Sequence, residues 1–239
     1  MASSKLSIVI PAYNEEDIIA ESVVAITNFF KLQKLNFEIL VVDDGSTDKT
    51  AAVIKELSLK NLRLLKNGRN RGKGFSVKKG VKEAEGDIVL FTDADLSTPI
   101  EQFDKLREAL VDCEVAIGSR VIKGAEIRKK QPFHRLIMGR IFNIIVRLLT
   151  GLNYRDTQCG FKLFSADAAK RIFRAVKAEG FGFDVEVLML AEKFGYRVKE
   201  VPVVWINRAK SKVWPLRDTF RMTREVLEIR SRVGSRKTI

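Results

Sequence analysis

Apolar runs without polar alternation recur along the first half of the chain, and a helical pattern separates each run from the next. The runs lie at residues 6–13, 37–44, 61–67, 87–97 and 114–120. The helical patterns lie at residues 15–32, after 47, at 73–84 and at 100–110. Continuous apolar runs of this kind are typical of parallel strands that are buried on both faces. The pattern predicts an α/β fold, with a doubly wound, mostly parallel sheet flanked by helices.

The second half departs from this rhythm after Arg120. A basic loop around Pro132 is expected to lead into an unusually apolar helix over residues 133–152. The rest of the pattern predicts a strand at 155–164, helices at 166–176 and 184–194, a strand at 197–207 and a basic helix at 216–233. With 239 residues, 46% of them hydrophobic, the chain is expected to form a single domain over residues 1–239.

Positive charge is concentrated in two segments of the chain. Lys and Arg number 43 against 30 Asp and Glu, which gives a formal net charge of +13. Residues 120–150 contain eight Lys or Arg and one Glu, and residues 207–239 contain ten Lys or Arg and three Asp or Glu. Such segments indicate a surface that meets polyanions, namely nucleic acid, anionic lipid or a phosphorylated substrate.

The apolar basic helix allows two interpretations. Its apolar face could lie in the headgroup region of a membrane, or it could pack on the sheet or on another subunit. Asn143 and Arg147 interrupt its apolar stretch, so the stretch is too short to span a membrane.

The cysteines and the first residues of the chain indicate where the protein is located. The two cysteines have no CxxC spacing and the first residues do not resemble a signal peptide. We therefore expect a cytoplasmic protein that is peripheral on the cytoplasmic face of a membrane.

His134 is the only histidine in the chain, which excludes histidine-based metal sites and Ser-His-Asp triads. Any chemistry must therefore rest on carboxylates, cations and a bound metal. Asp93 and Asp95 follow a buried run, so both carboxylates can emerge at the end of one strand. Together with water and a substrate phosphate they suit Mg²⁺ or Mn²⁺. The alternative is helix capping, although Ser97 or Thr98 is expected to cap the next helix.

The ends of the other runs carry further polar groups. Asp43 and Asp44 end the second run, where a carboxylate can accept hydrogen bonds from a ribose or a base, or can cap the following helix. Pro11 and Tyr13 could form a wall for a base, with Glu15 as an acceptor, although a plain strand-to-helix turn explains the same residues. Because the carboxyl ends of parallel strands share one edge, these groups are expected to line one crevice.

The glycine-rich stretch GRNRGKG matches neither the G-x-G-x-x-G spacing nor a Walker A loop. Lys73 within it remains a candidate contact for a phosphate or a base, and a solvated turn is the equal alternative. Lys212, in the basic second segment, is a candidate clamp for a diphosphate, again with a solvated lysine as the alternative.

Six motifs occur in a characteristic order along the chain: PAYNEE, VVDDGSTD, NRGKG, FTDADLS, IGSR and RDTQCGFKLF. In this order the chain resembles the family 2 glycosyltransferases of the GT-A fold, and the resemblance covers almost all of it. Within that family it is most similar to polyprenyl-phosphate glycosyltransferases. The stretches DTQCGFKLF, GFGFDVEVLMLAEKFGY and VPVVWIN resemble the dolichyl-phosphate β-glucosyltransferase branch more than the mannosyltransferase branch.

The resemblance implies a nucleotide diphosphate sugar as donor and a set of contacts for it. These are Pro11, Tyr13, Glu15, Asp44, and Val42 behind the base, to which Lys73, Asp93, Ala94 and Lys212 are added as candidates. It also implies a metal, Mg²⁺ or Mn²⁺, held by Asp95 with Asp93 close by. Relatives of the mannosyl branch carry Gln at the position of Ser97, so a further metal ligand stays open.

The expected reaction is the inverting transfer of a hexose, glucose from UDP-glucose, to a polyprenyl or dolichyl monophosphate. A phosphate monoester is largely a dianion at neutral pH, so it needs no general base. It needs cations, and Arg120 and Arg135 are the candidates because a guanidinium binds phosphate bidentately. Asp95, Arg120 and Arg135 are thus the candidate catalytic residues. An anionic membrane surface is an expected partner and nucleic acid is not.

Three alternatives remain open at this level. The acceptor could be a sugar or polysaccharide hydroxyl, which would need a carboxylate base such as Asp156. The donor could be GDP-mannose. The chain could also be a non-catalytic protein that binds membranes or nucleic acid through its basic segments, although this leaves the polar strand ends unexplained.

Overall fold

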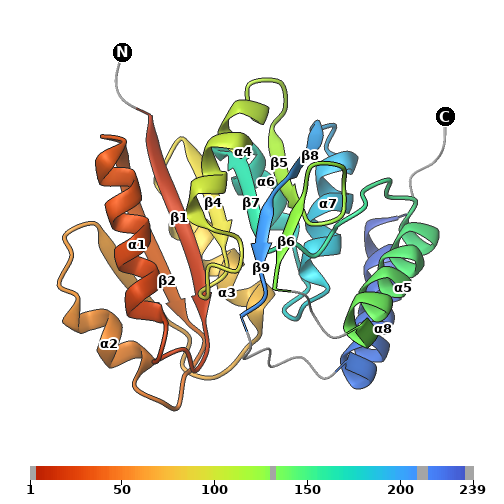
Figure 1. Cartoon of the computed structure of the whole chain (residues 1–239). Helices are drawn as coiled ribbons and strands as arrows, with labels where there is room; N and C mark the ends of the chain where they lie inside the picture. The colour runs from red at the N-terminus through yellow and green to blue at the C-terminus, as the bar shows by residue number, and fades with distance from the viewer. Residues whose placement is uncertain (1–3, 130–132, 209–214, 235–239) are drawn as a thin grey trace.

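The computed structural model describes residues 4–129, 133–208 and 215–234, without the side chains of residues 133–138, 140, 141 and 215–221. Its main sheet has seven strands in the order β3-β2-β1-β4-β7-β5-β8 (Figure 1). These strands are β1 (Lys5–Ala12), β2 (Asn36–Asp43), β3 (Leu62–Lys66), β4 (Ile88–Thr92), β5 (Val115–Ser119), β7 (Phe161–Ser165) and β8 (Val198–Pro202). Among them only β7 runs antiparallel to its neighbours, β4 and β5. The predicted mostly parallel α/β sheet is confirmed.

Helices cover both faces of the sheet, because the strand side chains that point to either face are apolar. One face carries α1 (Ile19–Leu32), α2 (Thr50–Glu56), the 3-10 helix η1 (Ile100–Gln102) and α4 (Phe103–Ala109). The other face carries α3 (Lys73–Glu83), α6 (Ala166–Ala175) and α7 (Phe183–Lys193). Ile8 packs into the first layer and its neighbour Val9 into the second, and both are fully buried. The period of two along each strand thus builds two cores on one sheet.

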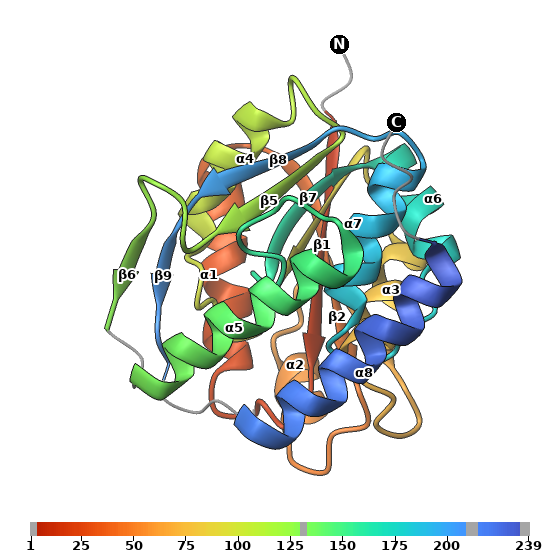
Figure 2. The ribbon, with the colours of Figure 1, turned by 90° about the vertical axis from the view of Figure 1, so that its right-hand side faces the viewer.

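Two long helices form an outer layer. α5 (Phe133–Thr150) and α8 (Pro215–Val233) pack against each other, and α8 also packs on α7 (Figure 2). In the described part of these helices, Val146 and Val226 are buried, whereas Ile144, Leu148 and Leu227 are exposed. The predicted amphipathic surface helices are therefore present. Within the parts of the chain that the structure describes, no helix is both long enough and apolar enough to cross a membrane.

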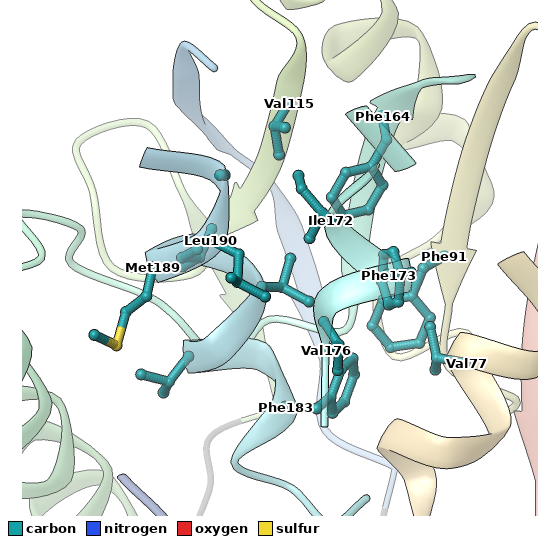
Figure 3. Close-up of a cluster of buried hydrophobic side chains, with 14 of the residues drawn as sticks. Val77, Phe91, Val115, Phe164, Ile172, Phe173, Val176, Phe183, Met189 and Leu190 are labelled. Carbon is teal, nitrogen blue, oxygen red and sulfur yellow. The ribbon is translucent and has the colours of Figure 1, made fainter. Parts of the chain in front are cut away.

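Aromatic pairs pack between the central strands and the helices α6 and α7. Phe91 of β4 and Phe183 of α7 meet edge to face with their ring centroids 5.7 Å apart, and Phe164 and Phe173 pair in the same way at 5.6 Å. Figure 3 shows these rings together with Val176 and Leu190. Large rigid side chains in such contacts fix the positions of the elements that bear them. The end of β4 is therefore held firmly against the start of α7.

Several expected elements differ from the structure. The strand expected at residues 155–164 is shorter, because β7 begins only at Phe161. Residues 197–207 form two strands, because Pro202 ends β8 in the main sheet and β9 (Val204–Ile206) leaves it. β9 pairs in parallel with β6 (Glu126–Arg128), inside a segment that was expected to be a loop. β6 has only three residues, all exposed, so no pattern of apolar residues in the sequence marks it as a strand.

The first helix also begins later than expected, at Ile19 rather than near residue 15. The intervening residues form a turn in which the N–H groups of Ile18 and Ile19 both donate to the Glu15 carbonyl. The Glu15 N–H donates in turn to Thr50 Oγ1 at 2.8 Å. The segment is thus held by α2, at the end of β1.

Candidate active site

The carboxyl ends of β1, β2 and β4 meet at one edge of the sheet, as the sequence predicted. Between β1 and β4 the order of the strands reverses: β2 and β3 follow on one side of β1, and the later strands follow on the other side of β4. Ligands of open α/β sheets bind at such a switch point. The register places Pro11 beside Val42 and Ala12 beside Asp43. The Asn14 side chain accepts from the Thr47 N–H at 2.8 Å, so the two loops are joined. The segments that follow β1 and β2 therefore lie side by side at this edge.

Asp44 is buried and holds the glycine-rich loop. Its Oδ1 accepts from Asn67 Nδ2 at 2.7 Å and from the Arg71 N–H at 3.0 Å, and its Oδ2 accepts from the Gly72 N–H at 2.8 Å. The capping alternative is wrong, because α2 begins only at Thr50 and has no side-chain cap. A carboxylate has about four acceptor sites, so Asp44 keeps capacity for a ligand while it positions the loop.

Asp95 lies on a tight turn after β4, in which Leu96 has a positive φ of 46°. Both of its oxygens accept from Ser97: Oδ1 from the backbone N–H at 2.8 Å and Oδ2 from Oγ at 2.7 Å. The expected capping by Ser97 or Thr98 is wrong, since neither η1 nor α4 has a side-chain cap. Ser97 instead folds back and fixes the orientation of the Asp95 carboxylate.

Asp93 lies between β7 and the start of α3. The Lys73 ammonium contacts Asp93 Oδ1 at 2.6 Å, and the Asp93 N–H donates to the Gly160 carbonyl at 3.2 Å. A Cβ on Gly160 would overlap the Asp93 carboxylate, so only glycine fits there. Ala94, between the two aspartates, is buried. The structure therefore brings Lys73 to the aspartate pair, a juxtaposition that the sequence did not predict.

The glycines of the NRGKG loop allow close backbone packing. Gly72 has a φ of 102°, a conformation that favours glycine. A Cβ on Gly74 would lie 2.7 Å from Phe183 Cβ. The Phe75 N–H donates to the Glu179 carbonyl at 3.2 Å. This packing against the segment before α7 sets the position of Lys73, the first residue of α3.

A buried ion pair, which the sequence analysis missed, lies behind the aspartates. Lys162 of β7 donates to Asp184 Oδ1 at 2.5 Å and to the Cys159 carbonyl at 2.6 Å. The two side chains are 1% and 2% exposed. Burial raises the pKa of Asp184 and outweighs the opposing attraction of Lys162 and Lys73. One signal existed, because Lys162 is a charged residue within the otherwise apolar strand FKLF.

Arg120 follows β5 and forms a second ion pair, with Asp156. Its Nε and Nη2 donate to the two carboxylate oxygens at 2.7 and 2.8 Å, and its backbone N–H donates at 2.9 Å. Burial alone would raise the pKa of Asp156, but the charge and hydrogen bonds of Arg120 outweigh it and hold the pKa below its ordinary value of 3.8. A carboxylate so occupied is a poor proton acceptor. Asp156 is thus better suited to orienting Arg120 than to acting as a base.

Two of the candidate residues cannot be placed beside these groups. Lys212 lies outside the described residues, and Arg135 belongs to the first turn of α5, where the side chains lie outside them. Their predicted roles at a diphosphate and at an acceptor phosphate stay predictions.

The sequence model of Glycosyl transferase family 2 matches residues 7–173, a range that contains the carboxyl ends of β1, β2, β4 and β5. The chain belongs to this family. The predicted relationship is therefore confirmed, and the chain is a glycosyltransferase.

Relatives that resemble this glycosyltransferase along nearly its whole length include dolichyl-phosphate β-glucosyltransferases. The protein of Dictyostelium discoideum is 35% identical over 95% of this chain and 74% of its own length. The human protein is 33% identical over 96% of this chain and 76% of its own. The Saccharomyces cerevisiae protein is 35% identical over 94% of this chain and 74% of its own.

Solved structures confirm the GT-A fold. Glucosyl-3-phosphoglycerate synthase from Mycobacterium tuberculosis, in a complex with Mn²⁺, UDP and phosphoglyceric acid, superposes with a TM-score of 0.71 at 21% identity. The alignment covers 99% of this transferase and 81% of that chain. Mannosyl-3-phosphoglycerate synthase from Rubrobacter xylanophilus superposes with a TM-score of 0.69 at 20% identity, over 96% and 73% of the two chains.

The aspartate pair of this transferase fits a metal that other groups help to hold. In the described part of the chain, no three His, Cys, Asp or Glu side chains are grouped to bind a metal on their own. Mg²⁺ commonly takes one or two protein carboxylates and completes its shell with water and substrate phosphates. Asp93 and Asp95 supply that number of hard oxygen ligands at the edge of the crevice, so they suit an ion that binds together with a diphosphate.

The Arg120–Asp156 pair gives the transferase a specific dependence of stability on pH. Because the folded-state pKa of Asp156 is lowered, the pair stabilises the protein fully above the unfolded-state pKa, and this stabilisation is lost as pH falls through the folded-state value. The difference in unfolding free energy between wild type and Asp156→Asn should be constant above about pH 5 and shrink below about pH 4. Denaturant titrations at several pH values measure it, with the exposed Asp112→Asn as control. A difference that is independent of pH would contradict the ion pair.

Proposed function

We propose that this glycosyltransferase transfers glucose from UDP-glucose to a polyprenyl or dolichyl monophosphate, with inversion, on the cytoplasmic face of a membrane. The observation that carries the proposal is the identity of 33–35% to dolichyl-phosphate β-glucosyltransferases along 94–96% of the chain. The site supports it independently, because its polar groups are carboxylates and cations rather than an activated nucleophile.

The state of Asp156 supports a phosphate acceptor. A lipid monophosphate is already an anionic nucleophile at neutral pH, whereas a hydroxyl acceptor needs a base. Asp156, the candidate base, is buried and paired with Arg120. The pair uses two of the five N–H donors on the Arg120 guanidinium. The remaining donors of Arg120, together with Arg135, would orient the acceptor phosphate for attack at the anomeric carbon.

The donor side of the site consists of the loops after β1, β2 and β4. Pro11, Tyr13 and Val42 would enclose the base, with Glu15 and Asp44 as hydrogen-bond acceptors for the nucleoside. Asp93 and Asp95 would hold Mg²⁺ or Mn²⁺, which when bound neutralises the charge that develops on the departing diphosphate. Lys73, and Lys212 in the second basic segment, would contact the same diphosphate.

The outer helices support a membrane-surface location. On their described parts, exposed Ile144, Leu148 and Leu227 lie among arginines, including Arg147 and Arg224. Apolar side chains flanked by cations suit the headgroup region of an anionic bilayer, where a polyprenyl chain presents its phosphate. We therefore propose that the α5–α8 layer contacts the membrane.

The decisive experiment is a transfer assay with defined acceptors. The purified protein with Mn²⁺ or Mg²⁺ and radiolabelled UDP-glucose should convert polyprenyl phosphate to a glycolipid, and chelation of the metal should stop the reaction. Unphosphorylated polyprenol is the matched control and should give no product, because the proposal requires the phosphate as nucleophile. Transfer from GDP-mannose instead of UDP-glucose would replace the proposed donor. Transfer only to sugar hydroxyls would contradict the proposed acceptor.

A further inference from the structure

A lysine ammonium contacts one of the two carboxylates that suit a metal ion. Lys73 contacts Asp93 Oδ1 at 2.6 Å, and its side chain is 19% exposed. Its Nζ lies 5.1 Å from the ring centroid of Phe91 and 6.0 Å from that of Phe181, distances typical of cation–π contacts. The ammonium is therefore held in a defined place rather than in bulk water. Asp93, one of the two carboxylates that suit a metal, already has a cation beside it.

Two further carboxylates attract the same ammonium. Asp184 interacts electrostatically with Lys73, and so does Asp95. Lys162 fixes the position of Asp184 through its contact at 2.5 Å and itself lies 5.8 Å from the Phe91 ring centroid. The Phe91 ring thus contacts both ammonium groups. Lys73 has two alternative anionic partners, Asp93 at the metal site and Asp184 behind it.

A divalent ion on Asp93 and an ammonium in contact with the same carboxylate repel each other strongly at such short range. The ion must therefore either displace Lys73 or bind weakly. A nucleotide diphosphate changes this balance, because its oxygens add negative charge that both cations can share. The cost of moving Lys73 is thus offset only when metal and diphosphate arrive together.

We propose that Lys73 is the resident counter-cation of the metal site: it neutralises Asp93 until metal and nucleotide diphosphate bind together, and Asp184 then becomes its main protein partner. The inference rests on the metal site of the proposed function. It adds that the metal binds to this site together with the nucleotide and not before it. Divalent metal alone binds weakly, and metal and nucleotide bind with positive coupling. Asp93 therefore stays neutralised in the empty enzyme.

Binding of Mn²⁺ in the absence of nucleotide tests this directly, by electron paramagnetic resonance of the free ion or by calorimetry. Lys73→Met should bind Mn²⁺ about tenfold more tightly than wild type, because removal of a neighbouring cation changes a carboxylate's affinity for positive charge by at least that factor. Lys73→Arg keeps the charge and should stay within about twofold of wild type. Lys82→Met, an exposed lysine on the same helix, controls for net charge and should not differ from wild type. If Lys73→Met does not fold, Lys73→Gln takes its place.

The coupling to nucleotide gives a second readout. In wild type, UDP should tighten Mn²⁺ binding strongly, whereas in Lys73→Met this gain should be several-fold smaller, since the cation that UDP releases from Asp93 is absent. Equal Mn²⁺ affinity in wild type and Lys73→Met would overturn the proposal, as would an equal increase in Lys82→Met.

Asp95→Ala separates this proposal from the proposed function. If UDP-dependent Mn²⁺ binding exists and Asp95→Ala abolishes it, the metal site stands, and only the behaviour of Lys73 decides the inference. If wild type binds no Mn²⁺ even with UDP, the metal site of the proposed function is wrong and the inference is overturned with it.

Discussion

Replacement of Asp95 by alanine should lower kcat/KM for glucosyl transfer by about 10²- to 10³-fold, the usual effect of removing a group that stabilises developing charge. Asp95 carries this effect because its carboxylate is already oriented by two hydrogen bonds from Ser97. The loss should appear in transfer assays with saturating Mn²⁺, and the thermal unfolding temperature should change little.

Two control variants sharpen this prediction. Ser97→Ala removes the hydroxyl that donates to Asp95 Oδ2 and leaves the ligand in place, so a smaller loss of about 10-fold is expected from its altered orientation. Asp112→Ala removes an exposed carboxylate that precedes β5, at the end of the strand opposite the site, and should leave transfer unchanged. Full activity of Asp95→Ala in the presence of a chelator would show that no metal acts at this turn.

The sequence predicted the strand ends because period and polarity are local properties. Continuous apolar runs required a buried sheet, and the polar groups that follow them had to lie at its edge. The pairing of Pro11 with Val42 then follows from the parallel register.

Local sequence patterns gave wrong predictions where the path of the backbone determines which groups meet. Ser97 looked like a helix cap, but the positive φ of Leu96 turns it back to Asp95. β6 and β9 exist only because three exposed residues pair across a long separation.

The Lys162–Asp184 pair was missed for a different reason. The two residues are 22 positions apart. Each lies in a stretch that carries the family resemblance, but nothing in either stretch indicates that the two side chains meet. A charged residue within an apolar strand is a signal of a buried partner, because an unpaired buried ammonium is too costly to persist. That signal identifies the need for a carboxylate but does not say which one. Only the packing of α7 against β4 and β7 assigns Asp184.

Single substitutions in this pair should have the largest effects on stability. Lys162→Met or Asp184→Leu leaves one buried charge without its partner, so the free energy of unfolding should fall by about 3–5 kcal/mol. Denaturant titration measures this loss. Arg224→Ala, which breaks the exposed pair with Glu228, is the matched control and should cost less than about 1 kcal/mol.

The double variant Lys162→Met/Asp184→Leu distinguishes a structural from a positioning role. An apolar pair of similar volume is often as stable as a buried ion pair, so most of the lost stability should return. The Cys159 carbonyl would still lack the donor that Lys162 provides, and the Lys73 ammonium would lose its attraction to Asp184. We therefore expect the folded double variant to keep a raised KM for UDP-glucose and a lowered kcat. Recovery of both stability and transfer would mean that the pair serves only the core, whereas recovery of stability alone would assign it to positioning the catalytic edge of the sheet.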